Sequence, residues 1–394
     1  MSLIKKPGEM AEAFVMKSKR IAIFSANYLP YLGGVEKFTE GLSGALADMG
    51  HSVTIVTNNT FNLSSKETLR EGVDLVRLPC FPLIRGRLPM PKPSVEFSAL
   101  WDEISCIKFD GVLINTRFYA HTLLGIFLAR KNGIDPVVLD HGSAHLTFGN
   151  SILDVFVRLY EHGITSLVKR FRPVFYGISD KSVEWLKHFN INAEGVIPNS
   201  IDAARFRESA SQRSFRNELG IGSDLMLVFT GRFVPEKGIS TLIAMMSSLK
   251  GSAVQLVMAG DGPLLDDILS SGLEKIHVVG RLSSEDIAAL LLECDLLCLP
   301  SRSEGFSTSL LEASACGTPA LTTDVGGARE LIPGASIGFI SDSADACVFA
   351  ETVKAVLNGV YDLGAMGKRA QRLVESNYSW ESVACSLLDA IRCG

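Results

Sequence analysis

Short apolar runs alternate with helical patterns along the whole chain, which predicts a series of β-α-β units. In the first half the runs are almost continuously hydrophobic, as in parallel strands that helices cover on both faces. Apolar residues between Val35 and Met49 recur at helical spacing and Gly50 can end that helix. The predicted strands of this half are Ile21–Phe24, Val53–Thr57, Val73–Leu78, Val112–Asn115, Val137–Asp140 and Val174–Ile178.

The second half restarts the pattern after a polar, charged link between Ile197 and Gly222. With 394 residues, the chain is predicted to form two doubly wound α/β domains, over residues 1–199 and 200–378, followed by a lone amphipathic helix that begins at Ser379. The predicted strands are Leu225–Thr230, Val254–Ala259, Ile276–Val279, Leu296–Leu299 and Pro319–Thr322. The predicted helices are Ser240–Leu249, Pro263–Leu269, Asp286–Leu292 and Ser309–Cys316.

Two doubly wound sheets predict a shared ligand cleft. In such sheets ligands bind beyond the carboxyl ends of the strands, and pockets favour domain interfaces. We therefore expect the loops that follow the strands to carry the chemistry, with the substrates meeting between the domains.

Composition narrows the class of function. The hydrophobic fraction of 47% and the charged fraction of 21% are those of a globular protein, and a net charge of −5 argues against a nucleic-acid partner. The eight cysteines form no C-x-x-C pair and have no histidine partners at zinc spacing, so we expect no metal site and a reducing, cytoplasmic compartment. No apolar stretch is long enough to span a membrane, and residues Met1–Arg20 do not resemble a signal peptide.

The first candidate ligand loop is Tyr28–Val35, which lies between the first strand and the first helix. Gly33 and Gly34 would let a ligand approach the backbone at a helix N-terminus, where negative charge is favoured. The loop is not G-x-G-x-x-G, and the chain has no Walker loop, which disfavours NAD and P-loop proteins. A tight turn without a ligand is the other interpretation, and the loop alone leaves both open.

The second candidate loop, Thr230–Gly238, follows the first strand of the second half. It places Arg232 and Lys237 just before a helix. An arginine fork and a lysine point charge together suit a diphosphate. Charges on a solvated loop are the alternative, but the position and the pairing favour a binding site.

The third candidate loop, Ser301–Pro319, also follows a strand and carries Glu304 and Glu312. Backbone N–H groups between Gly305 and Ser309 can point at an anion, and carboxylates can accept sugar or ribose hydroxyls. The spacing Ser309-x-x-Glu312 also fits a capping box, in which Glu312 would serve the helix instead of a ligand.

Several motifs, taken in order, resemble glycosyltransferase family 4. They are stronger in the second half than in the first, and together they extend over nearly the whole chain. The second-half motifs are Gly231–Gly238, Ala259–Pro263, Val279–Leu282, Glu304–Gly317 and Thr323–Gly327 with Glu330. The first-half motifs are Gly33–Glu36 and Ile197–Asp202.

This resemblance implies the GT-B fold, in which two Rossmann-like domains face each other across a cleft and the C-terminal helix, here 379–394, crosses back to the first domain. It also implies a retaining sugar transfer from a nucleotide-diphosphate sugar, with no cofactor and no required metal. By resemblance Arg232 and Lys237 hold the diphosphate, Glu312 the ribose and Glu304 the donor sugar, while Leu282 lines the base pocket. Backbone N–H groups that would hold sugar and phosphate belong to Gly305, Phe306, Ser307, Thr308 and Ser309.

A histidine of the first half is the remaining candidate. His141 follows the strand Val137–Asp140 and should face the cleft, with Asp140 as the group that orients it. The resemblance implies that a histidine at a comparable place contacts the donor sugar. His145 lies close by in the sequence and stays open as the alternative.

The first domain is expected to bind the acceptor. The segment Arg77–Pro93 interleaves basic and apolar residues, as does Leu167–Pro173, and such segments can dock on an anionic lipid surface. A proline-stiffened loop is the alternative. We expect a glycan or lipid-linked acceptor in cell-surface polysaccharide or glycolipid synthesis, with the protein cytoplasmic and peripheral on the cytoplasmic face of the inner membrane. A sugar-nucleotide epimerase and a non-catalytic nucleotide-sugar-binding subunit are the competing functions.

Overall fold

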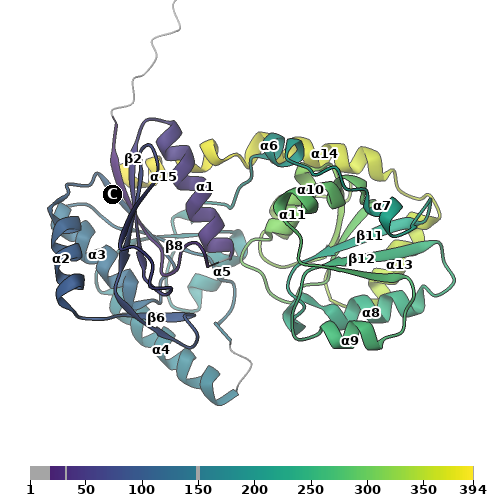
Figure 1. The fold of residues 1–394 in the computed structure, drawn as a ribbon, viewed down its shortest axis with the longest axis horizontal. Helices are drawn as coiled ribbons and strands as arrows, with labels where there is room; N and C mark the ends of the chain where they lie inside the picture. The colour runs from purple at the N-terminus through teal and green to yellow at the C-terminus, as the bar shows by residue number, and fades with distance from the viewer. Residues whose placement is uncertain (1–17, 32, 148–150, 394) are drawn as a thin grey trace, which may run out of the picture.

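Two α/β domains lie side by side in the computed structural model, which describes residues 18–31, 33–147 and 151–393 (Figure 1). Most of Met1–Arg20, the segment that was not expected to be a signal peptide, lies outside the described residues. Leu32 of the first candidate loop and the last residue of the predicted helix 379–394 lie outside them too.

The first domain is built on a sheet in which the described residues form eight strands, in the order β10-β9-β8-β7-β1-β2-β4-β3. All neighbours are parallel except β3 and β4, which are antiparallel. All six strands predicted for this half are present. The strands are β1 (Arg20–Phe24), β2 (Ser52–Asn58), β3 (Lys66–Arg70), β4 (Val73–Leu78), β7 (Gly111–Asn115), β8 (Val137–Asp140), β9 (Val174–Gly177) and β10 (Gly195–Val196).

Helices cover both faces of this sheet, which explains the continuous apolar runs. Along β1, Ile21 and Ile23 face one core, while Ala22 and Phe24 face the other. The first core also receives side chains from α1 (Gly34–Asp48) and α15 (Trp380–Cys393). The second receives side chains from α2 (Val95–Cys106), α3 (Ala120–Asn132), α4 (Ser151–Lys169) and α5 (Asp180–Lys187).

The second domain has a parallel sheet with the order β13-β12-β11-β14-β15-β16 among the described residues. The strands are β11 (Leu225–Thr230), β12 (Val254–Ala259), β13 (Ile276–Gly280), β14 (Leu296–Leu299), β15 (Ala320–Thr323) and β16 (Phe339–Ser341). The helices of this part of the chain are α6 (Ala203–Glu208), α7 (Phe215–Glu218), η1 (Pro235–Lys237), α8 (Ile239–Ser248), α9 (Leu265–Ser270), α10 (Ser284–Glu293), α11 (Thr308–Ala315), α12 (Ala328–Leu331), α13 (Ala346–Leu357) and α14 (Leu363–Asn377).

The basic-apolar segment after β4 forms a proline-containing hairpin, and its docking on a lipid surface stays a prediction. Its strands β5 (Cys80–Leu83) and β6 (Leu88–Pro91) pair antiparallel. Arg77 does not belong to the exposed part of this segment, because its side chain is buried at the end of β4 and donates to Glu67 at 2.7 Å. The exposed basic groups of the hairpin region are therefore Arg85 and Lys92.

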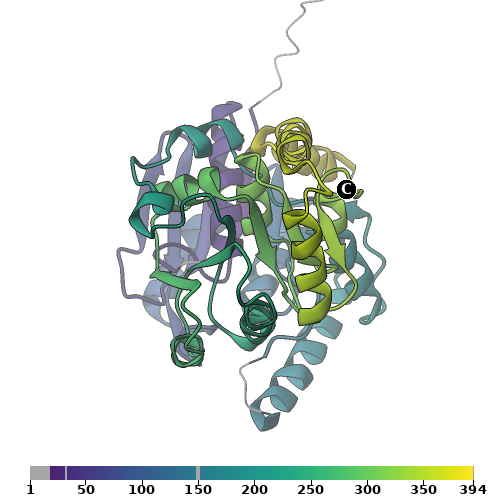
Figure 2. The same ribbon diagram turned by 90° about the vertical axis from the view of Figure 1, so that its right-hand side faces the viewer.

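The last helix returns to the first domain, as expected. While α14 packs on α11, α15 lies against α1 (Figures 1 and 2). The Trp380 ring stacks edge-on against Phe38, with 5.8 Å between ring centroids, and it also covers Gly41. A Cβ atom at Gly41 would lie 2.2 Å from Cε2 of Trp380, so only glycine fits beneath this ring. The exact boundaries 1–199 and 200–378 stay a prediction.

Replacing Gly41 with alanine is expected to destabilise the protein. The new methyl group overpacks the α1–α15 contact, which costs about 1–3 kcal/mol. Gly44→Ala is the matched control on the same helix, because its nearest contact would be an ordinary 3.5 Å to Arg70. Alanine's higher helix propensity should make that variant neutral or more stable by up to about 1 kcal/mol. Thermal unfolding followed by circular dichroism checks both, and equal melting temperatures would contradict the prediction.

Candidate functional site

The candidate loops follow strands that lie at the point in each sheet where the strand order reverses. In a doubly wound sheet the crevice opens at the switch point between strands that continue to opposite edges. The switch point lies between β1 and β7 in the first sheet and between β11 and β14 in the second. Arg232 and Lys237 follow β11, Glu304 follows β14, and Gly33 follows β1. Two of the three candidate loops therefore lie at one switch point.

The structure brings Lys237 and Glu304 together. The Lys237 ammonium donates to Oε1 of Glu304, and the Ser301 hydroxyl donates to the same oxygen at 2.9 Å. Gly238 ends η1 with φ +71°, and a Cβ atom there would lie 2.1 Å from the Pro300 carbonyl oxygen. This close packing of the two loops fixes the lysine beside the carboxylate.

Within the described residues, the side chains of Arg232 and Leu282 form no hydrogen bond with this pair. The Arg232 side chain is exposed and has no ion-pair partner among the residues that the structure describes. Leu282 follows β13, is half-buried and packs against the core of the second domain. The structure therefore leaves the exposed Arg232 guanidinium accessible to an anion.

Glu312 faces the other domain, and the capping-box interpretation is wrong. Ser307, not Ser309, caps α11, because its hydroxyl accepts from the backbone N–H of Leu310 at 3.3 Å. The Ser309 hydroxyl instead donates to the carbonyl oxygen of Thr230 at 3.2 Å. Oε1 of Glu312 lies 3.5 Å from Nζ of Lys37 on α1. Burial raises the pKa of the Glu312 carboxyl, and the Lys37 charge offsets part of that rise.

The loop that carries Glu304 also touches the first domain through its backbone. The Ser143 hydroxyl donates to the carbonyl oxygen of Glu304, and the Ser179 hydroxyl donates to that of Gly305 at 2.9 Å. A Cβ atom at position 305 would lie 1.9 Å from the carbonyl oxygen of His141, which requires glycine. Phe306, next in the chain, is buried against Tyr378, with 5.9 Å between ring centroids.

His141 lies at this junction, held by Asn115 and not by Asp140. Its Nε2 donates to Oδ1 of Asn115 at 2.8 Å, and the Asn115 amide donates to the Thr39 hydroxyl at 3.0 Å. Burial lowers the pKa of His141 to about 3, so the ring is neutral at physiological pH. Asp140 was expected to orient this ring, but its carboxylate accepts instead from Arg117 at 2.6 Å. Asn115 ends β7, the strand next to β8, and sequence reasoning missed it as the partner of His141.

His145 has different neighbours. Its Nδ1 lies 2.7 Å from Oε2 of Glu161, and its ring is within 5.5 Å of the rings of His162 and His188, centroid to centroid. The sequence did not single out this group, because its members are far apart along the chain. Of the two histidines that were left open, His141 is the one whose backbone contacts Gly305.

Gly33 and Gly34 begin α1. Gly33 is the N-cap residue, and a Cβ atom there would lie 2.4 Å from Oε2 of Glu36, whereas the same atom at Gly34 meets nothing within 4 Å. One turn further on, Lys37 reaches Glu312. Sequence reasoning missed Lys37, because the pattern of α1 marks it only as an exposed polar position.

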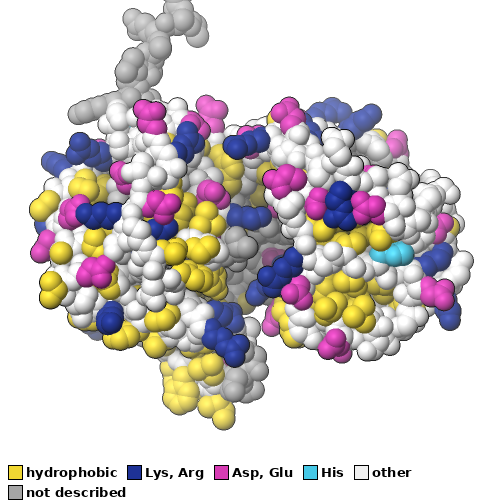
Figure 3. All heavy atoms as spheres, viewed as in Figure 1, with side chains coloured by type: hydrophobic (Ala, Val, Ile, Leu, Met, Phe, Trp, Pro, Cys, Tyr) yellow, Lys and Arg dark blue, Asp and Glu magenta, His cyan; other side chains and the backbone are white. Residues whose placement is uncertain are grey.

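A groove separates the two domains, with lysine and arginine side chains along its edges (Figure 3). A cavity of about 1770 Å³ lies between α1, residues 199–206 and α11, and its walls include Lys37, Thr308 and Glu312. Among the described residues its lining does not include Lys237 or Glu304. The cavity is thus open beside Glu312, while the backbone of Glu304 and Gly305 contacts the first domain.

Two Rossmann-like domains with parallel sheets, joined by a C-terminal helix that crosses back, define the GT-B class of glycosyltransferases. Residues 32–205 match the family model described as Glycosyltransferase Family 4, and residues 211–380 match the model for Glycosyl transferases group 1. The two models together account for most of the chain, which therefore consists of two glycosyltransferase domains, the first of the Glycosyltransferase Family 4 type and the second of the group 1 type.

Individual relatives agree with this assignment. The phosphatidylinositol N-acetylglucosaminyltransferase GPI3 subunit of Saccharomyces cerevisiae is 26% identical over 382 residues, which are 92% of this chain and 80% of that protein. Sucrose-phosphate synthase of Thermosynechococcus elongatus superposes with a TM-score of 0.72 at 18% identity, covering 95% of this chain and 98% of the other. HepE of Anabaena in complex with UDP-glucose gives a TM-score of 0.70 at 18% identity, with 95% and 100% covered.

Proposed function

We propose that this glycosyltransferase moves a sugar, with retention of configuration, from a nucleotide-diphosphate sugar to a glycan or lipid-linked acceptor. The observation that carries the proposal is the placement of Lys237 and Glu304 at the switch point of the second sheet, against His141 of the first domain. A structural relative has UDP-glucose bound, which supports a donor of this class. The likeness of the fold to that of sucrose-phosphate synthase is also consistent with a sugar-transfer function.

The charges of the site suit a departing nucleoside diphosphate. As the glycosidic bond breaks, negative charge builds up on the leaving phosphate, and preorganised cations and dipoles lower the barrier. Lys237 is held beside the proposed diphosphate site, and the exposed Arg232 side chain can reach the phosphate. The N-terminus of α11, at Ser307–Ser309, adds the partial positive charge of the helix dipole. In this proposal these groups neutralise the diphosphate that a divalent ion neutralises in metal-dependent transferases.

The contacts of Glu304 argue against a nucleophilic role. Lys237 and Ser301 both donate to its Oε1, so this oxygen is held in place beside the proposed sugar site. We infer that Glu304 orients the donor sugar and that the leaving phosphate accepts the proton of the acceptor hydroxyl on the same face. Neutral His141 can then exchange hydrogen bonds with sugar hydroxyls without adding charge.

The donor experiment separates this function from its competitors. The purified chain is assayed against UDP-, GDP- and ADP-sugars for release of the nucleoside diphosphate, with the anomeric configuration of the product read by NMR. A retained configuration with an acceptor present supports the proposal. An inverted product refutes retention, a sugar-nucleotide epimer formed without acceptor identifies an isomerase, and binding without turnover of any donor identifies a binding subunit.

Glu312→Gln is expected to weaken donor binding while stabilising the free protein. A carboxylate that accepts ribose hydroxyls contributes about 1.5–3 kcal/mol, so affinity for the nucleoside diphosphate should fall about 10- to 100-fold. Because the folded-state pKa of Glu312 is raised, the buried charge opposes folding once the pH exceeds the carboxyl's unfolded pKa. The neutral amide of glutamine removes that cost. The ion pair with the exposed Lys37, which the substitution also removes, contributes little stability. Isothermal titration calorimetry tests the expected loss of affinity, and a melting curve at pH 8 tests the expected gain in stability. A variant that binds the nucleoside diphosphate normally would contradict the ribose role.

The first domain offers a surface for an anionic membrane, and we propose it as the acceptor side. On α4, Ile152, Val155, Phe156 and Leu159 are exposed at i, i+3, i+4 and i+7, one face of the helix. Figures 1 and 2 both show α4 projecting from the end of this domain. The Tyr160 hydroxyl contacts Sδ of Met90 at 3.7 Å, which couples the helix to the β5–β6 hairpin.

Basic groups accompany these apolar side chains. Phe81 and Leu83 are exposed on the hairpin, and Arg85, Lys92 and Arg158 are exposed on the hairpin region and α4. This combination is typical of surfaces that insert shallowly between anionic headgroups. No helix within the described residues has both the length and the apolar character needed to cross a membrane.

Replacing either the apolar or the basic side chains of this surface is expected to weaken vesicle binding. Phe156→Asp with Leu159→Asp removes the apolar anchor, and Arg85→Glu with Lys92→Glu removes about 1 kcal/mol of attraction per basic group. Each pair should lower co-sedimentation with phosphatidylglycerol vesicles at least about tenfold. Leu269→Asp, an exposed apolar residue of the second domain, is the control. Unchanged binding of both pairs would refute the membrane surface.

A further inference from the structure

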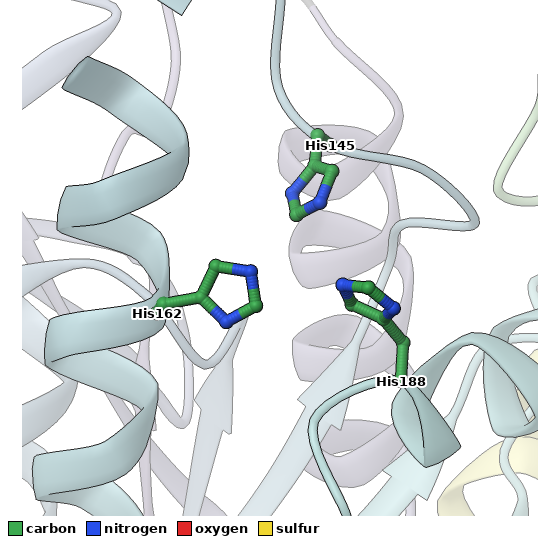
Figure 4. A group of neighbouring side chains, drawn as sticks. All are labelled: His145, His162 and His188. Carbon is green, nitrogen blue, oxygen red and sulfur yellow. The ribbon is translucent and has the colours of Figure 1, made fainter. Parts of the chain in front are cut away.

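Three histidines of the first domain gather on one side of the sheet, away from the Lys237–Glu304 pair. His145 lies in the loop after β8, His162 on α4 and His188 at the C-terminal end of α5 (Figure 4). One ring nitrogen of each lies within 4.8 Å of the others. Figure 4 shows the three rings pointing toward a common centre.

A buried carboxylate orients the innermost of these rings. Nδ1 of His145 donates to Oε2 of Glu161 at 2.7 Å, which leaves the lone pair of Nε2 for another partner. Glu161 is held in turn by the fully buried Arg117. A histidine that donates one ring nitrogen to a carboxylate and presents the other is the usual arrangement of metal-binding histidines, in which the carboxylate fixes the tautomer and raises the basicity of the ligand.

Aromatic packing restricts the rings further. The Trp185 indole stacks on His188 at 4.9 Å between ring centroids and 3° between planes. Trp185 also meets His145 edge-on at 4.9 Å, and Phe189 lies 4.9 Å from His162. These ring contacts hold one side of each imidazole, while the side chains of His162 and His188 keep exposed surface.

We propose that His145, His162 and His188 bind a divalent transition metal of the zinc class. Imidazole is a preferred ligand of such ions, and three histidines with one open position is an established zinc arrangement. Zinc–nitrogen bonds of about 2.0–2.1 Å place the nitrogens of a tetrahedral site about 3.4 Å apart. His162 and His188 are solvent-exposed, so rotation of their side chains can close the remaining gap.

The ion would fasten three separate segments of the first domain. It would tie the loop 141–147 to α4 and α5, and this loop carries both His141 and Ser143, which touch the second domain. The bound metal would therefore hold the loop 141–147 in place at a position other than its contacts with the second domain. This site is separate from the proposed sugar-transfer chemistry, so either proposal can fail alone.

Direct metal titration of the full chain, purified without a histidine tag and stripped by chelation, tests the site. Co²⁺ is the spectroscopic probe, and Zn²⁺ then displaces it. We expect one equivalent of Co²⁺ with a visible tetrahedral absorption, and at least a tenfold loss of affinity in His162→Ala and in His188→Ala. His277→Ala, which removes a histidine of the second domain, is the matched control and should bind as the wild type does.

Other outcomes overturn the site. Substoichiometric binding, or a Co²⁺ affinity that His162→Ala and His188→Ala leave unchanged, would show that the three rings do not act together. Both variants replace exposed side chains, so circular dichroism should confirm that they fold. A melting temperature that rises with Zn²⁺ in the wild type and in His277→Ala, but not in the two site variants, would support the fastening role.

Discussion

Lys237→Met is expected to lower kcat/KM for sugar transfer about 10²- to 10³-fold, the usual cost of removing one preorganised donor that faces developing negative charge. Methionine keeps the length of the side chain but removes the ammonium group, so the packing beside Gly231 is retained. Glu304 then loses its ion-pair partner and keeps only the Ser301 hydroxyl at 2.9 Å. The measurement is nucleoside diphosphate release under single-donor steady-state conditions.

Lys250→Met is the matched control for this prediction. Lys250 is an exposed lysine of the same domain, outside the candidate loops, and its replacement should leave kcat/KM unchanged. If Lys237→Met retained wild-type kcat/KM, the diphosphate would not be bound at the β11–β14 switch point, and the proposed donor site would be wrong.

Arg117→Met is expected to destabilise the first domain by about 3–5 kcal/mol, because it leaves uncompensated buried charge. Arg117 is fully buried and pairs with Asp140 at 2.6 Å and with Glu161, both of which are buried as well. Desolvation of Asp140 raises the pKa of its carboxyl, and the Arg117 charge is what opposes that rise. For a domain of this size the melting temperature should fall by about 10 °C.

Two variants make the Arg117 result interpretable. Arg70→Met breaks the exposed pair with Asp48 in the same domain, and should change stability by less than about 1 kcal/mol. Adding Asp140→Asn and Glu161→Gln to Arg117→Met removes the orphaned charges, and should recover part of the loss. If Arg117→Met melted within a degree or two of the wild type, the buried cluster would contribute nothing net to folding.

The sheet framework was predictable because buried parallel strands leave a strong apolar signal. Leu225–Thr230, Val254–Ala259 and Leu296–Leu299 were located residue for residue. The edge strand β3 and the β5–β6 hairpin were missed, because every residue of β3 is exposed and the hairpin contains three prolines, so neither shows a period-2 apolar pattern. An apolar sequence pattern reports the burial of a strand, so strands that are largely exposed cannot be predicted from it.

The site was predictable only as far as the loops. Position after a strand was enough to single out Lys237 and Glu304, which the structure places in contact, although the sequence did not predict that contact. Side-chain partners were not predictable, because Asn115 reaches His141 and Lys37 reaches Glu312 from segments that are remote in sequence. The capping-box error has the same origin, since spacing within one helix says nothing about the carboxylate's attraction to a second domain.

The hydrogen bonds from Ser143 and Ser179 to the second domain end on the carbonyl oxygens of Glu304 and Gly305, not on side chains. A main-chain acceptor survives substitution of the residue that carries it. The residue at 304 can therefore change without loosening these two bonds between the lobes. Under the proposed role of Glu304 in orienting the donor sugar, donor selectivity and lobe attachment are separable traits, and selectivity can be redesigned without detaching the lobes.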